Sequence, residues 1–209
     1  MKKFIKKVLF TLTSAAVCLS VASCGNTAQD NTANNESKND KVYKVGVTQF
    51  ADHPSLDNCR EGFIEGLKNN GFTEGENLEI EFKSAQSDMA MATQIAQAFA
   101  NNKKDLVCGI ATPSAQSLYA SCESVGIPVI FNAISDPVAA KLAVSETENM
   151  KGITGISDRL PVKEQLELIR KILPDAKKIG ILYTVGEANS VSTIETYKEL
   201  AGKYGFEIV

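Results

Sequence analysis

The sequence has little of what a metal centre or a disulfide framework needs. It contains one histidine, His53, and five cysteines, two of which fall within the first 24 residues. The remaining three are odd in number and too widely spaced for any zinc template, so we expect free buried thiols and no metal or cofactor. They are Cys59, Cys108 and Cys122. His53 precedes a proline and is expected to cap a helix or face solvent.

An excess of basic residues is also missing. The formal net charge is -3, and the first 23 residues contribute four lysines and no acidic residue, so their removal would bring the net charge to -7. A protein that binds a polyanion needs a basic face that releases counterions. Nucleic acid is therefore not expected among the partners.

Motifs that hold nucleotides or form a catalytic centre are absent as well. No G-x-G-x-x-G follows the first predicted strand, and no G-x-x-x-x-G-K-[ST] occurs. Ser114 lies at a predicted strand-to-helix turn but lacks the flanking glycines of a nucleophile elbow. No pair of base and nucleophile is supported, so the sequence predicts a protein that is not an enzyme. An exported enzyme is the least favoured alternative.

The apolar run near the N-terminus, residues 8–21, is too short to span a membrane comfortably, since a spanning helix needs roughly 20 apolar residues. Four lysines precede it, and small residues follow, which is typical of a secretory signal peptide over residues 1–23. The sequence Val21-Ala22-Ser23-Cys24 resembles a bacterial lipobox, so Cys24 is expected to carry acyl chains that anchor the protein. An ordinary signal peptide cut nearby is the alternative.

The residues after Cys24 predict a tether, because they are rich in Asn, Thr, Asp, Ser and Lys and lack large apolar side chains. The expected organisation is a signal peptide over residues 1–23, a lipidated cysteine with a disordered tether over 24–41, an N-terminal α/β lobe over 42–150, and a hinge crossing with a partial C-terminal lobe over 151–209. The folded part would lie at the extracytoplasmic face of the cell membrane.

Apolar runs with strand character alternate with helical segments from residue 43 onward, which indicates an α/β fold with a parallel sheet. Strands are predicted over 43–49, 78–83, 105–112 and 127–133, with a further strand over 152–157. The second alternates apolar and charged residues, as an edge strand does. Right-handed crossovers then favour the strand order 2-1-3-4, with a switch point between the first and third strands.

The loops at this switch point are the expected binding site, because ligands of such sheets bind outside the carboxyl ends of the strands. Thr112 is predicted to be the N-cap of a helix that begins at Pro113, where free N–H groups and the Ser114 hydroxyl would suit a carboxylate. Gln49 and Phe50 end the first strand with an amide and an aromatic ring, although Phe50 could instead belong to the core.

A second set of candidate residues follows a strand predicted over 178–184 and precedes a helix predicted over 191–204. Glu187, Asn189 and Ser190 would face the first site across a cleft. Asp136 and Asp158 lie at predicted turns, where each could accept an ammonium group or act as an ordinary turn residue. The sequence after residue 161 gives a helix over 161–173, the strand and helix just named, and a strand over 206–209. This unit is unfinished, so we expect a fragment of a longer, two-lobed protein.

Five blocks of the sequence together resemble the substrate-binding lipoproteins of ABC importers, of the tryptophan- and tyrosine-binding type. The resemblance runs from about residue 42 to the last residue, and the blocks occur in the family's order. They are Val45-Gly46-Val47-Thr48-Gln49-Phe50, Ala111-Thr112-Pro113-Ser114-Ala115-Gln116, Ser135-Asp136-Pro137-Val138-Ala139, Gly155-Ile156-Ser157-Asp158 and Gly186-Glu187-Ala188-Asn189-Ser190.

This resemblance implies a type I periplasmic-binding-protein fold, with a ligand held between two α/β lobes. The motif positions that would line the cleft are Gln49, Thr112, Ser114, Asp136, Asp158, Glu187, Asn189 and Ser190. The expected ligand is a small zwitterion, an aromatic amino acid by preference, and the expected partners are ABC permease subunits and the membrane through the lipid anchor. The alternative is a surface domain that senses a ligand and presents it to a signalling receptor.

Overall fold

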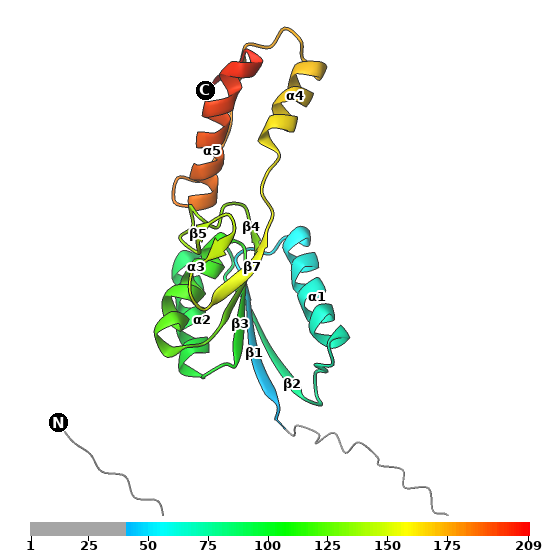
Figure 1. Cartoon of the computed structure of the whole chain (residues 1–209), viewed down its shortest axis with the longest axis vertical. Coiled ribbons are helices and arrows are strands. Elements are labelled where there is room, and N and C mark those ends of the chain that lie inside the picture. The colour runs from blue at the N-terminus through cyan, green and yellow to red at the C-terminus, as the bar shows by residue number, and fades with distance from the viewer. Residues whose placement is uncertain (1–40) are drawn as a thin grey trace, which may run out of the picture. The chain divides into compact units, whose positions relative to one another are not determined.

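The structure is a computed structural model that describes residues 41–209 (Figure 1). The predicted signal peptide, Cys24 and nearly all of the predicted tether lie outside the described residues. In residues 41–209, no helix is long and apolar enough to cross a membrane.

A five-stranded parallel sheet forms the centre of the fold, in the order β2-β1-β3-β4-β7. Its first four strands confirm the predicted order 2-1-3-4, and β2 is the edge strand that its alternating pattern predicted. The predicted strand over 152–157 is β7, which pairs with β4 at the other edge. The strands are β1 (Tyr43–Gln49), β2 (Leu78–Ser84), β3 (Leu106–Ile110), β4 (Val129–Ile134) and β7 (Ile153–Ser157).

Three helices cover the two faces of this sheet: α1 (Pro54–Asn69), α2 (Met89–Asn101) and α3 (Thr112–Cys122). Helices α2 and α3 lie together on one face, and α1 lies on the other (Figure 1). The face below α2 and α3 holds a large cluster of buried apolar side chains that includes Phe99 and Leu118. The face below α1 holds a smaller cluster around Val47 and Cys108.

The chain enters the sheet at the amino ends of the strands, on the side opposite the predicted site. The Lys41 ammonium forms an ion pair of 2.7 Å with the carboxylate of Asp105, which lies just before β3. The other carboxylate oxygen of Asp105 accepts a hydrogen bond of 2.8 Å from the backbone N–H of Lys44. These contacts fix the first described residues beside the start of β3.

A short antiparallel hairpin between β4 and β7 was not predicted from the sequence. It consists of β5 (Ala143–Ser145) and β6 (Glu148–Asn149). Two strands of three and two residues give too few alternating positions for a period of two to be recognised.

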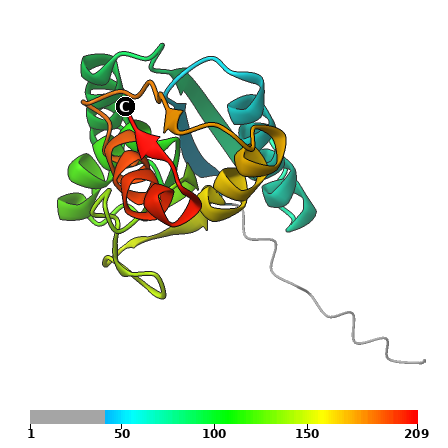
Figure 2. The ribbon, with the colours of Figure 1, turned by 90° about the horizontal axis from the view of Figure 1, so that it is seen from above.

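Residues 161–209, which we call the C-terminal segment, form a small unit of helices α4 and α5 with a two-stranded parallel sheet, seen from above in Figure 2. Its core consists of Val162, Leu166, Ala201 and Phe206. The elements are α4 (Val162–Ile172), β8 (Lys178–Ile179), α5 (Ala188–Ala201), the 3-10 helix η2 (Gly202–Tyr204) and β9 (Glu207–Ile208).

The strands of the C-terminal segment are shorter than predicted. β8 ends at Ile179, whereas the sequence predicted a strand to residue 184, and Leu182 in that stretch is fully exposed. Among the described residues, β8 pairs with β9 alone. The residues after Ile179 therefore have no second neighbouring strand with which their backbone groups could pair. The predicted helix over 191–204 is α5, which begins three residues earlier and ends in the 3-10 turn.

Arg170 joins the ends of this small unit. Its guanidinium lies 3.9 Å from the centre of the Phe206 ring. The same group donates hydrogen bonds to the carbonyls of Pro174 at 2.7 Å, Ala176 at 2.9 Å and Tyr204 at 2.8 Å. One side chain therefore fixes the turn after α4 to the turn before β9.

Candidate functional site

The carboxyl ends of the sheet strands carry unusual backbone geometry. Several residues other than glycine have positive φ, and four of them lie near the carboxyl ends of β2, β3 and β4: Gln86, Ser87, Ala111 and Ala133. Such conformations cost of order 1–3 kcal/mol each and tend to cluster at functional sites. The backbone geometry therefore indicates a functional site at this edge, which is the edge that the sheet topology also predicts.

One of these strained turns joins β3 to α3. Ala111 has φ 70° and ψ 155°, a region in which glycine is the usual residue, and it occupies the N-cap position. The prediction that Thr112 is the N-cap is wrong, because the turn places Thr112 inside the helix as its first residue. No side chain caps this helix start. The positive end of the α3 dipole is thus left available at the switch point.

Ser114, in the first turn of α3, is completely buried, and its hydroxyl has no hydrogen-bond partner in the described structure. The close approach of α3 to the sheet depends on Gly109, since a Cβ there would lie 2.6 Å from the Cα of Ala115. Thr48, the β1 residue paired with Gly109, has a second buried hydroxyl without a partner. Sequence reasoning missed Thr48, since its position in a buried strand gave no signal.

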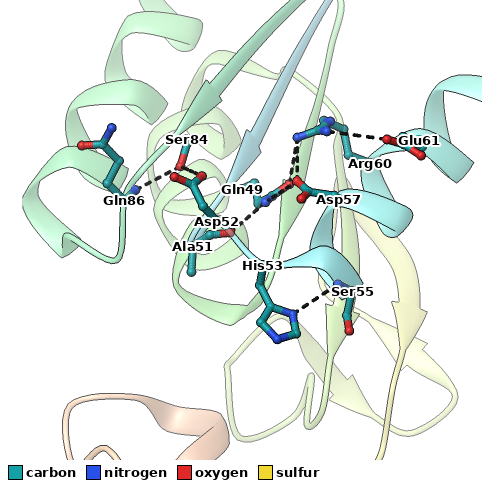
Figure 3. A network of polar contacts seen from close by, with 10 residues as sticks. All are labelled: Gln49, Ala51, Asp52, His53, Ser55, Asp57, Arg60, Glu61, Ser84 and Gln86. Atoms are coloured by element: carbon teal, nitrogen blue, oxygen red, sulfur yellow. Dashed lines mark hydrogen bonds and ion pairs between the residues drawn. The ribbon is translucent and has the colours of Figure 1, made fainter.

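Gln49 is held in a polar network rather than pointing freely from the end of β1 (Figure 3). Its amide nitrogen donates to the carbonyl of Ala51 at 2.7 Å and to the Asp57 carboxylate at 3.1 Å. Its amide oxygen accepts from Arg60 at 3.3 Å, and Arg60 also pairs with Asp57 at 3.0 Å. The network fixes the loop after β1 against α1, so Gln49 stabilises the conformation of that loop.

Phe50 and His53, in the same loop, have structural roles. Phe50 is 8% exposed and belongs to the core cluster below α2 and α3, which was its alternative interpretation. His53 Nδ1 accepts a hydrogen bond of 3.2 Å from the N–H of Ser55 at the start of α1 (Figure 3). This confirms the capping role expected for the histidine.

Asp136 follows β4 and has both carboxylate oxygens occupied by protein donors. One accepts from the N–H of Ala139 at 2.9 Å, and the other accepts from the hydroxyl of Ser192 in α5. Burial alone would raise the pKa of Asp136, but these two hydrogen bonds and the nearby charge of Arg159 outweigh it and hold the pKa below its ordinary value. Asp136 is therefore an ionised group that contacts the C-terminal segment.

Asp158 follows β7 and differs from Asp136 in the contacts of its carboxylate. Its backbone N–H donates to the carbonyl of Ile134 at 3.2 Å, which fixes its position beside the end of β4. Within residues 41–209, its carboxylate has no hydrogen bond or ion pair. Burial, and then the negative charge of Asp158, raise the pKa of the Cys59 thiol in α1.

Glu187, Asn189 and Ser190 lie at the start of α5. Glu187 is the N-cap and makes no capping bond with its side chain. The side-chain oxygen of Asn189 is enclosed and has no partner in the described structure. Buried polar groups are seldom left without a partner, so Asn189 and Ser114 both call for an explanation.

Two cavities lie where α5 meets the carboxyl end of the sheet. One, of about 430 Å³, is lined by residues 185–188, 191 and 192 together with Ala139. The other, of about 230 Å³, is lined by Ser135, Asp136, Arg159, Leu160, Val162, Ser192, Thr193 and Thr196. The structure thus brings the Asp136 turn and the start of α5 together. Thr112 and Ser114 line neither of these two cavities.

The other reactive groups are structural. Cys108 and Cys122 are buried free thiols and Cys59 is a half-buried one. Burial raises the pKa of Cys108 to about 12 and that of Cys122 to about 11. Residues 41–209 contain no group of three or more histidine, cysteine or acidic side chains that could hold a metal ion.

A comparison with protein families gives a match over most of the chain. Residues 44–209 match the model of the ABC transporter substrate binding protein family. This chain belongs to that family. Proteins of the family bind substrates for transporters outside the cytoplasm and are not enzymes, which agrees with the functional class predicted from the sequence.

Individual relatives are similar over part of their length. A tyrosine-binding protein of Clostridioides difficile is 36% identical over 207 residues, which are 98% of this chain and 59% of that protein. An ABC domain from Streptococcus pneumoniae in complex with L-Trp is 36% identical, with a TM-score of 0.76 over 81% of this chain and 56% of that one.

A third relative was solved in an open form. This substrate-binding protein from Clostridium difficile, ligand-free and with adhesive properties, is 43% identical, with a TM-score of 0.63 over 80% of this chain and 56% of that one. The chain thus has the higher structural similarity to the L-Trp complex, although the open protein is closer in sequence. The periplasmic-binding-protein-like α/β fold predicted from the sequence is confirmed, and the chain spans between half and two thirds of these relatives.

Proposed function

We propose that this protein captures an aromatic amino acid as the substrate-binding component of an ABC importer. The family, the tyrosine-binding relative and the relative in complex with L-Trp support this class of ligand. The observation that carries the proposal is the start of α3, which is strained and uncapped and lies at the topological switch point of the sheet.

The ligand's carboxylate would bind at this helix start, near Thr112 and Ser114. Backbone N–H groups and the helix dipole favour an anion there. The Ser114 hydroxyl, which has no partner in the described structure, would gain one from the ligand after a small rearrangement of the surrounding side chains.

The ligand's ammonium would bind Asp158 in preference to Asp136. Both were candidates, but the Asp136 carboxylate already accepts two hydrogen bonds. Asp158 has no such partner within residues 41–209 and lies at the same edge of the sheet. An exposed carboxylate at this edge can form a charge-assisted hydrogen bond with an ammonium group.

The remaining candidate residues would complete the site from the start of α5. Glu187, Asn189 and Ser190 would contact the ligand from the side of the C-terminal segment, and Gln49 would hold the loop beside it. Ligand contacts on both sides favour a closed state over an open one, and permease subunits would recognise that closed state.

A lipid on Cys24 would keep the protein at the extracytoplasmic face of the membrane. The lipobox-like sequence supports this part of the proposal. The mass of the protein extracted from membranes should include acyl chains on Cys24, and an unmodified Cys24 would contradict the anchor without affecting the ligand site.

Calorimetry of the full chain with L-tryptophan and L-tyrosine tests the site. We expect one or both to bind, and we expect Ser114→Ala and Asp158→Asn to weaken binding at least tenfold each, since each removes a polar contact worth more than about 1.4 kcal/mol. Ser117→Ala in the same helix and Asp175→Asn, at an exposed position, are the matched controls. Binding by both site variants as tight as by the parent would show that the site is misplaced. If the parent binds neither amino acid, the proposed ligand class is wrong.

A further inference from the structure

The contact between Asp136 and Ser192 joins two parts of the fold that are 56 residues apart in the chain. Asp136 belongs to the turn after β4 in the large sheet. Ser192 lies in the second turn of α5, in the C-terminal segment. The N–H of Ala139 fixes the Asp136 turn without any contribution from Ser192.

The surroundings of this contact strengthen it. Both residues line the cavity of about 230 Å³ together with Arg159 and Leu160, which belong to the connection between β7 and α4. Arg159 is held by an ion pair of 2.5 Å with Glu146 in the β5–β6 hairpin. Its positive charge favours the ionised form of Asp136, and a hydrogen bond to an ionised acceptor is stronger than one between neutral groups.

We infer that the Asp136 carboxylate and the Ser192 hydroxyl form a clasp that holds α5 against the carboxyl end of the sheet. Ser192 is then a positioning residue, because it sets where Glu187, Asn189 and Ser190 lie without contacting the ligand itself.

Only the role of the clasp rests on the proposed function, namely that it sets the distance between the two halves of the ligand site. Its existence does not depend on any ligand. The test can therefore be made on the unliganded protein, so that its failure and a failure of the proposed function are distinguishable.

Hydrogen exchange of the full chain without ligand measures the clasp. We expect Ser192→Ala to speed exchange of the amides in residues 188–196 about tenfold, because a lost hydrogen bond to a charged group is worth roughly 1.5 kcal/mol or more. Exchange in β1 and β3 should not change, and this reports that the variant is folded. Thr193→Ala, the neighbouring residue of the same cavity and without a hydrogen bond to Asp136, is the matched control and should leave exchange at the parent rate.

Two further variants separate the clasp from a general effect on helix stability. Ser192→Thr keeps the hydroxyl and should restore protection to within about twofold of the parent. Asp136→Asn should speed exchange in the parent but add little in the Ser192→Ala background, as expected of two residues that interact. Equal exchange in Ser192→Ala and Thr193→Ala, or additive effects of Asp136→Asn and Ser192→Ala, would overturn the inference.

Discussion

The large sheet and the C-terminal segment have the same βα sequence pattern but differ greatly in how many apolar side chains they bury. In the large sheet, β1, β3 and β4 have strands on both sides, and helices cover both faces. In the C-terminal segment, two strands of two residues pair only with each other among the described residues, and the core cluster has four buried members. Ile172 and Val185 are 66% and 78% exposed there.

This difference predicts that the stability of a βα unit depends strongly on the strands and helices around it. A strand in the middle of a parallel sheet has its backbone groups paired on both sides, and its side chains are covered on both faces. An isolated pair of strands has neither advantage. We therefore expect the C-terminal segment to open at lower cost than the large sheet, and we use three substitutions to test this.

The largest effect should come from the large sheet, at Gly109. A Cβ at this position would lie 2.6 Å from the Cα and 2.7 Å from the N of Ala115, so Gly109→Ala must push α3 away from β3. We expect the free energy of unfolding to fall by about 3 kcal/mol, at the upper end for overpacked cores, as measured by urea denaturation. Binding at the α3 start should be lost as well.

Gly62→Ala is the control for that substitution. Gly62 lies within α1, and a Cβ there would have no neighbour within 4 Å, so the change should stabilise the protein by about 0.5–1 kcal/mol through helix propensity. A drop in stability of similar size in both variants would show that the contact between α3 and β3 is not what makes Gly109 necessary.

A smaller and more local effect should follow from Arg170→Ala in the C-terminal segment. The substitution removes the hydrogen bonds to the carbonyls of Pro174, Ala176 and Tyr204, together with the stacking on Phe206. We expect local opening of residues 161–209 to become easier by about 2 kcal/mol, measured by hydrogen exchange, while β1 and β3 keep their protection.

The neighbouring Lys171→Ala is the matched control, since Lys171 is exposed and makes no comparable set of contacts. Its effect should stay within about 0.5 kcal/mol. If Arg170→Ala destabilised β1 and β3 as much as α5, the two regions would unfold as one unit, and the comparison drawn above would be wrong.

The smallest effect should come from relief of strain at Ala111. Glycine tolerates φ 70° and ψ 155°, so Ala111→Gly should raise the free energy of unfolding by about 0.5–1 kcal/mol after the greater flexibility of the unfolded chain is counted. Ala120→Gly, at an exposed position inside the same helix, should lower it by about 1 kcal/mol. Changes of the same sign in both variants would mean that the turn is not strained.

The sequence predicted the large sheet better than the candidate site. Continuous apolar runs such as the one that contains Val107 and Ile110 identify central strands, and the alternation of β2 identifies an edge, so the strand order followed. The strained turn at Ala111 could not be predicted, because alanine gives no sign of a positive φ. The partner of Asp136 could not be predicted either, since Ser192 is brought to it by the tertiary fold and by no local pattern.

The entry of the chain at the amino ends of the strands has a mechanical consequence. Lys41 and Lys44 fasten the beginning of the fold to Asp105, so a force transmitted from the preceding residues would be borne by that ion pair and by the ladder of β1 with its two neighbours. The candidate site lies at the far end of the same strands and would carry none of this load directly. If Cys24 carries the proposed lipid, a pull from the anchor would therefore act on the ends of the strands opposite the candidate site.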